Sequence, residues 1–544
     1  MALRELVDLR QDAGALCADL ARVELAFARG MPFPATIREL VSAHPLASSA
    51  DGLAQAREAL EAATGAARVA RLSALRDFLV RARALQLEPG AAQEALELPR
   101  RPSVRLPGDP GLHGALPPVA VERDLAYVRE RDERAAAESA LAAAERSAAG
   151  VRTALWEAAQ EALGELESGS PANAALRLHE RGWIALPTDG SQESPPATDD
   201  RPPPSETPPP GTLVRAGAPP ISEREPVTAA CEEFLGDTDA LARDLGAWLL
   251  ERHTGARAAP AGAARHDLLH FAHAPRFAGA FTRGELLRTV RRWAEMLRLD
   301  LGANGSVSLE DEERPLQPGG SRAVAFDPPH DVRVVVFSSE GPRALAGLLA
   351  ALGRAHLRAG PPPDAPPEDL WLGDPALEAA CGTLLAGLLL EGEWLRRCAR
   401  ADLSRDDERA LAVVELLDAR LCAARALASL EALREGLGAR AEQAFGELHE
   451  RAALVEIPSA LALRELDPWL SAWGELRGRA LAAHLRGYLR EGFDEDWWRN
   501  PRALPALAGL WGRGGRPTAA ELWAETSGSP SLRPLVAELS RACG

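Results

Sequence analysis

The stretch DVRVVVF, residues 331–337, is rich in valine, a residue that favours β-strands. Two shorter β-favouring runs precede it, at residues 307–309 and 324–326, and glycine and proline separate the three runs. On both sides of this region, leucine and alanine recur at helical spacing. We therefore expect a mainly α-helical protein with one small sheet near residues 305–340.

The composition divides the chain into segments. Residues 1–99 have the pattern of an N-terminal helical lobe, and residues 119–186 have that of a helical segment continuing this lobe. Residues 187–224 consist mainly of proline, serine, threonine, aspartate and glycine, which predicts a disordered insertion or linker because such sequence has few apolar groups to bury. Helical patterns resume over residues 225–535, around the three strand-like runs.

Charge and composition exclude several classes of function. The chain has no lysine, so all 62 basic residues are arginine, as in proteins from GC-rich bacterial genomes. Without lysine, a Walker phosphate loop, a Schiff base or a lysine general base is impossible. A net charge of −17 argues against a nucleic-acid partner. There is no apolar run of about 18 residues for a membrane span and no basic start before an apolar stretch, so we expect a cytoplasmic protein with no membrane contact.

Several passages around the strands are similar to one peptidase family. LGRA at residues 352–355 resembles the core of a zinc-binding helix, and WLGDPALE at residues 371–378 resembles the helix that carries a third zinc ligand. Together with the order of helices, three strands and a helix, they resemble the thimet oligopeptidase and oligoendopeptidase family of zinc metallopeptidases, which has the H-E-x-x-H motif. The resemblance covers about residues 225–535. It implies a two-lobed helical zincin-like shell around a cleft, with residues 331–335 as the edge strand.

The resemblance also implies a degenerate metal site. A zincin needs two histidines one helical turn apart and a glutamate that activates water. When Gly353 is placed on the family's glycine, Ala350 and Arg354 stand at the two histidine positions and Ala351 stands at the glutamate position. Glu378 alone remains as a metal-ligand position. We therefore expect no catalytic residue here and no cofactor.

Two further expectations follow from this alignment. The family's tyrosine, which steadies the oxyanion, falls near Glu475, so that donor is lost as well. A lone buried carboxylate is costly unless it is paired. We therefore predict that the guanidinium of Arg354 takes the zinc position and forms an ion pair with Glu378.

One histidine cluster offers an alternative metal site. His266, Asp267 and His270 give H-D-x-x-H, and His273 follows one turn later on the same helical face. Against zinc chemistry here, aspartate is one methylene shorter than glutamate and no strand precedes the motif. The alternative remains open at this stage, with zinc as its cofactor.

The sequence thus predicts a catalytically inactive homologue of a zinc oligopeptidase, a pseudoenzyme whose cleft still binds a peptide or a protein. Two alternatives stay open. One is an active metallopeptidase that hydrolyses oligopeptides with non-standard zinc ligands. The other is a helical scaffold that acts through its surface.

Overall fold

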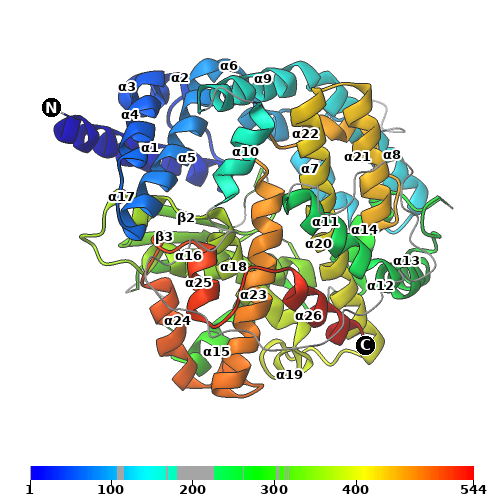
Figure 1. Ribbon diagram of the computed structural model, residues 1–544. Coiled ribbons are helices and arrows are strands. Elements are labelled where there is room, and N and C mark those ends of the chain that lie inside the picture. Colours follow the sequence, from blue (N-terminus) through cyan, green and yellow to red (C-terminus); the bar gives the residue numbers. More distant parts are fainter. Residues whose placement is uncertain are drawn as a thin grey trace, which may run out of the picture.

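The computed structural model describes residues 2–106, 115–166, 170–180, 226–260, 262–277, 279–299, 301, 305–312, 314, 316–317, 319–337 and 339–544. The insertion predicted for residues 187–224 lies outside the described residues. The fold is mainly α-helical, with two lobes and a small sheet, as the sequence predicts (Figure 1).

The first lobe is built from helices whose leucine and alanine faces pack on one another, and it occupies the upper part of Figure 1. Thr36 and Glu39 form a capping box that starts one of these helices. The helices are α1 (Ala2–Ala28), α2 (Ile37–Ala43), α3 (Pro45–Ser48), α4 (Ala50–Glu61), α5 (Ala66–Leu87), α6 (Pro89–Glu97), α7 (Pro118–Leu125), α8 (Arg131–Ser147), α9 (Ala149–Leu166) and α10 (Pro171–Glu180).

The second lobe surrounds the long helix α23, which runs through the middle of the molecule in Figure 1. Helices α16, α18, α20 and α23 pack closely and form its centre. The helices of this lobe are α11 (Pro226–Asp237), α12 (Asp239–Leu241), α13 (Ala247–Thr254), α14 (Arg265–His273), α15 (Arg283–Leu297), α16 (Pro342–Ala359), α17 (Pro367–Trp371), α18 (Pro375–Ala386), α19 (Gly392–Trp394), α20 (Arg405–Glu435), α21 (Ala439–Ala453), α22 (Ala462–Glu465), α23 (Ser471–Phe493), α24 (Leu504–Trp511), α25 (Ala519–Glu525) and α26 (Arg533–Cys543).

The sheet contains β1 (Val307–Glu310), β2 (Arg322–Asp327) and β3 (Asp331–Val335), in the order β1-β3-β2. β3 pairs parallel with β1 and antiparallel with β2. The expectation of residues 331–335 as the edge strand is therefore wrong, because β3 is the central strand. Its valines are buried on both faces, which suits a strand covered on both sides.

The sheet joins the two lobes. Val324 of β2 packs with Ala21 and Leu25 of α1, while α16 also packs against β2 and β3.

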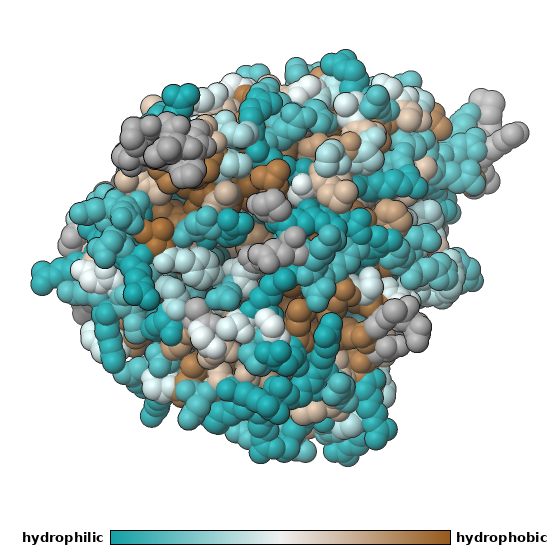
Figure 2. Space-filling model, turned by 180° about the vertical axis from the view of Figure 1, so that it is seen from behind, coloured by the Kyte–Doolittle hydropathy of each residue, from teal (hydrophilic) through white to brown (hydrophobic). Residues whose placement is uncertain are grey.

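The rear surface of the molecule is largely hydrophilic, and its apolar groups gather in a few places (Figure 2).

No single helix in the described ranges is long and apolar enough to cross a membrane. Two consecutive segments, Pro375–Leu390 and Gly392–Ala399, together reach that length and composition, but they are bent by 75° relative to each other.

Candidate functional site: a cleft beside the predicted metal-site position

Helices α16 and α18 cross at very short range at the place where the sequence predicts the metal site. A methyl group on Gly353 would lie 2.0 Å from the carbonyl oxygen of Cys381, and one on Gly382 would lie 3.1 Å from the carbonyl oxygen of Ala350. Only glycine allows this approach. The crossing brings the side chains that follow Gly353 to the N-terminal half of α18, where Glu378 lies.

Glu378 is held by an arginine, although not by the predicted one. Nη2 of Arg358 donates a hydrogen bond of 2.6 Å to Oε2 of Glu378, and Nη1 of Arg358 donates to the carbonyl oxygen of Leu372 at 3.0 Å. The charge of Arg358 holds the pKa of Glu378 below its usual value; burial opposes this, and the charge of Arg354 adds to it. The carboxylate is therefore ionised at neutral pH.

The prediction of an ion pair between Arg354 and Glu378 is wrong, because Arg358 is the arginine that pairs with Glu378. Within the part of the chain that the structure describes, Arg354 has neither an ion pair nor a hydrogen bond, and its Nε and Cγ lie against Gly382. Long side chains on a helix point back toward its N-terminus, so a residue one turn further along reaches the level of Arg354. That residue is Arg358, and its guanidinium donates the hydrogen bond to the carboxylate of Glu378.

The other three predicted positions differ in their surroundings. Ala350 is half-buried beside Gly382, whereas Ala351 is 1% exposed and lies in the core. Glu475 on α23 accepts a hydrogen bond of 3.0 Å from Nη2 of Arg479. Burial raises the pKa of Glu475, but the charges of Arg479 and its neighbours outweigh this and lower it. An ion-paired carboxylate therefore stands where the sequence places the lost tyrosine.

Two further charged residues interact with this region, Glu24 of α1 and Arg322 of β2. Burial raises the pKa of Glu24, while the charge of Arg322 acts in the opposite direction and Glu378 adds to the rise. Arg322 also lies within electrostatic range of Arg354. Its guanidinium carbon is 5.2 Å from the centre of the Phe27 ring. Electrostatic interactions thus link Glu24 and Arg322 with the side chains at the predicted metal-site position.

That space holds a pocket of about 620 Å³. Its walls come from α1, α5, α6 and α9 of the first lobe, from β2, and from the segments around α22 in the second lobe. Most of the lining is aliphatic or aromatic, including Phe27, Trp156 and Trp469. Its volume and apolar character are typical of small-ligand sites. Glu24 and Arg322 belong to the lining and lie within electrostatic range of Arg354, so the pocket adjoins the predicted metal-site position.

The residues present do not fit a catalytic zinc. Such a site needs three protein ligands, and of the predicted positions only Glu378 offers a donor atom, which Arg358 already holds. A second cation, Arg354, acts on the same carboxylate. In the described ranges, no three histidine, cysteine, aspartate or glutamate side chains are grouped to hold a metal ion. We therefore derive no reaction step through zinc.

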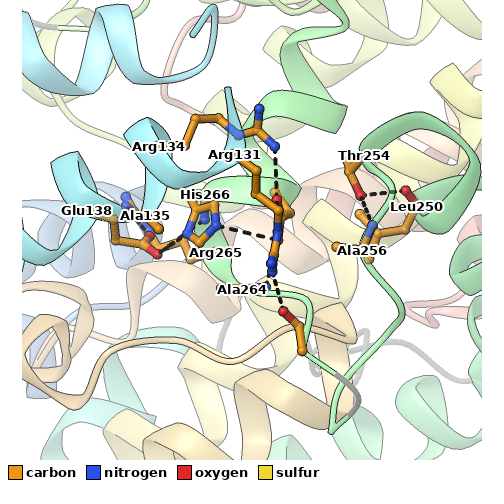
Figure 3. A network of polar contacts seen from close by, with 12 residues as sticks. Arg131, Arg134, Ala135, Glu138, Leu250, Thr254, Ala256, Ala264, Arg265 and His266 are labelled. Atoms are coloured by element: carbon orange, nitrogen blue, oxygen red, sulfur yellow. Dashed lines mark hydrogen bonds and ion pairs between the residues drawn. The ribbon is translucent and has the colours of Figure 1, made fainter. Parts of the chain in front are cut away.

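The alternative cluster on α14 makes a different kind of site, and Figure 3 shows one of its histidines, His266, beside Glu138. Nδ1 of His266 lies 2.8 Å from Oε2 of Glu138 on α8, and Nδ1 of His270 lies 2.9 Å from the carbonyl oxygen of Ala126. Nδ1 of His273 bonds to the carbonyl oxygen of Leu269 on its own helix. Each of the three imidazole rings therefore forms a hydrogen bond with a different partner.

The aspartate of the same motif has a structural role. Asp267 is fully buried and accepts hydrogen bonds from Arg131 and from Nη2 of Arg134, the latter at 3.0 Å. It also accepts a hydrogen bond from the backbone N–H of Ala264, which caps the start of α14. Burial raises the pKa of Asp267, but these donors lower it overall. The network fastens α14 to α8, as Figure 3 shows.

The fold is similar to that of several solved peptidases. The chain superposes on a carboxypeptidase of Pyrococcus furiosus with a TM-score of 0.55 and 12% identity, covering 100% of this chain and 99% of the other. For metallocarboxypeptidase 1 of Trypanosoma cruzi the TM-score is 0.56 at 13% identity, with 99% of both chains covered. A Bacillus anthracis protein assigned as oligoendopeptidase F gives a TM-score of 0.56 at 10% identity, covering 91% and 83%.

At these identities the likeness concerns the fold alone. No protein-family profile matches the sequence, and no curated protein matches it significantly. The three structures agree with the peptidase resemblance seen in residues 225–535 and extend it to the first lobe.

Sequence reasoning did not find three of the charged groups in this region. Arg358 lies four residues after Arg354, so helical periodicity could have named it as a candidate for the same face. Glu24 and Arg322 had no such signal, because only the tertiary packing of α1 against β2 brings them to the cleft.

Proposed function

We propose that this protein is a catalytically inactive homologue of a zinc oligopeptidase that uses its cleft to bind a ligand, with peptides or a protein segment as the ligands to test first. The main support is the contact between Arg358 and Glu378. A cation already satisfies the carboxylate at the last metal-ligand position, and Arg354 adds a second positive charge nearby. Binding a divalent cation there would bring three positive centres together.

The lack of a base and of an oxyanion donor supports the same proposal. Ala351 has no ionisable group and faces the core, and Glu475 is a carboxylate paired with Arg479. A carboxylate cannot stabilise a developing negative charge. The pocket of about 620 Å³ beside these residues supports the binding half of the proposal.

The test uses the purified full-length chain. Zinc per chain is measured by atomic emission after dialysis, and hydrolysis is followed on a mixture of quenched fluorescent peptides with and without a chelator. We expect far less than one zinc per chain and no chelator-sensitive hydrolysis. One zinc per chain with hydrolysis that the chelator abolishes would refute the proposal.

Binding is measured separately, so that the two halves can fail independently. Fluorescent extended peptides are titrated with the protein, and anisotropy is recorded. Saturable binding that Ala95→Trp weakens supports a binding cleft, because Ala95 lines the pocket and the indole would fill part of it. Absence of binding by any peptide or small ligand would leave a helical scaffold as the better description.

A further inference from the structure

Two of the arginines that line the pocket have no carboxylate within ion-pair distance among the described residues, although Glu24 acts on Arg322 from further away. In the described part of the chain, Arg81 on α5 and Arg322 on β2 form no ion pair and no hydrogen bond. Each lies over an aromatic ring that lines the same pocket: Arg81 over Trp469 at 5.3 Å and Arg322 over Phe27 at 5.2 Å. Stacking positions each guanidinium but leaves its N–H groups available to an anion.

The other two lining arginines differ. Arg464 is paired with both carboxylate oxygens of Glu122, and Arg152 lies 3.5 Å from Glu145. Their charges are therefore largely neutralised where they stand. The contrast identifies Arg81 and Arg322 as the cations that a ligand could use.

The lining holds one carboxylate, Glu24, which offsets only part of this positive charge. The surroundings of Glu24 raise its pKa. The charge balance of the pocket thus favours a negatively charged group.

An unsatisfied donor points to the same chemistry. The indole of Trp156 lines the pocket and is 5% exposed, yet its Nε1–H has no hydrogen-bond partner within the described residues. A buried donor without an acceptor destabilises the protein. A ligand with an oxygen acceptor would remove that cost, whereas a pure hydrocarbon would not.

We infer that this pocket takes a small amphipathic acid, with an apolar chain along the aliphatic walls and a carboxylate held by Arg81 or Arg322. The inference rests on the proposed binding function and names the class of ligand. The walls favour a small acid over a peptide. They are mostly aliphatic, so the several amide groups of a peptide would find few partners there, and each unpaired group is costly.

The experiment titrates decanoate into the full chain by calorimetry, with decanol and acetate as matched probes. We expect saturable binding of decanoate and at least tenfold weaker binding of each of the other two, because decanol lacks the charge and acetate lacks the chain. Equal affinity for decanoate and decanol, or no binding of decanoate, would overturn the inference.

Variants assign the binding to the pocket. Arg81→Gln combined with Arg322→Gln should weaken decanoate by at least tenfold while leaving decanol binding as it was. Arg83→Gln is the matched control, because Arg83 lies on the same helix but pairs with Glu165 and does not line the pocket. Ala95→Trp should weaken decanoate without removing a charge. Equal effects of the Arg83 change and the double change would overturn the inference.

A peptide arm distinguishes the two sources of a carboxylate. Trileucine with a free C-terminus is compared with its C-terminal amide. Binding of the free peptide but not of decanoate would overturn the small-acid inference while leaving the proposed binding function standing. A protein that carries zinc and hydrolyses peptides would instead refute the proposed function, whatever decanoate does.

Discussion

Nη2 of Arg358 lies 2.6 Å from Oε2 of Glu378, so an arginine side chain of α16 holds the carboxylate that the sequence aligns with a metal ligand. The same guanidinium also bonds to the carbonyl oxygens of Leu370 and Leu372, before α18 begins. One side chain thereby ties the end of α16 to the segment that leads into α18.

Replacing that arginine should therefore affect stability more than replacing its neighbour. Arg358→Gln should lower the free energy of unfolding by about 1 kcal/mol, since Glu378 is partly exposed and the pair is screened. Arg354→Gln is the matched control and should have a smaller effect, because Arg354 forms no hydrogen bond among the described residues. Urea unfolding measures both. If Arg354→Gln lowered the free energy of unfolding more than Arg358→Gln, Arg354 would be the partner of Glu378 instead of Arg358.

The tight crossing of α16 and α18 gives a second prediction. Gly353→Ala would place a methyl group 2.0 Å from a backbone oxygen that cannot move away without shifting α18. We expect a loss of at least 2 kcal/mol, roughly the cost of overpacking a core. Gly347→Ala, in the same helix, has its nearest neighbour at 3.9 Å and serves as the control. Thermal unfolding compares the two variants. Equal melting temperatures would contradict the packing argument.

The sequence predicted the strands well but not their order. Valine-rich runs mark β1, β2 and β3 close to their observed positions because β-propensity is a local property. Strand order depends on pairing between segments far apart in the chain, and β3 became central by pairing on both sides. The exchange of Arg354 for Arg358 has a similar origin. Helical spacing places Arg354 and Arg358 on the same face of α16. The direction of the side chains and the crossing of α16 with α18 decide that Arg358 pairs with Glu378.

The buried network around Asp267 supports a third prediction. Asp267→Asn removes the charge that both Arg131 and Arg134 use, and Arg134 is only 2% exposed. Leaving a buried cation unpaired costs about 3 kcal/mol. Asp244→Asn, an exposed aspartate, should cost little. Urea unfolding compares them, and an equally small effect of both would mean that water replaces the lost charge.

Acid should destabilise the protein through its buried histidines. Burial lowers the pKa of His356 to about 4, and its ring stacks on Trp511. In the unfolded chain, histidine binds a proton below about pH 6.5. Between these two values the unfolded state binds more protons, so stability falls as the pH falls from about 6.5 to about 4.

Removing that histidine should reduce the pH dependence. His356→Phe should shrink the stability difference between pH 7 and pH 5 by about 2 kcal/mol, which follows from the two pKa values. Unfolding by urea at both pH values measures this difference. His330→Phe is the control because His330 is exposed. An unchanged difference in the His356 variant would mean that this histidine has the same pKa in the folded protein as in the unfolded chain.

Building a zinc site at the predicted metal-site position tests whether Arg358 keeps the metal out. Ala350→His with Arg354→His supplies two imidazoles one turn apart, and Glu378 would complete three ligands. Arg358 still holds that glutamate, so the double variant should bind zinc weakly. Adding Arg358→Leu frees the carboxylate and should tighten zinc binding by at least tenfold, since a charge-assisted hydrogen bond no longer competes. Zinc affinity is measured by competition with a chromogenic chelator. Glu378→Gln in the triple variant is the control and should reverse the gain.

Peptidase activity should remain feeble even after Ala351→Glu, because Ala351 faces the core and Glu475, paired with Arg479, cannot donate to an oxyanion. Equal zinc affinity with and without Arg358 would show that this arginine does not keep the metal out.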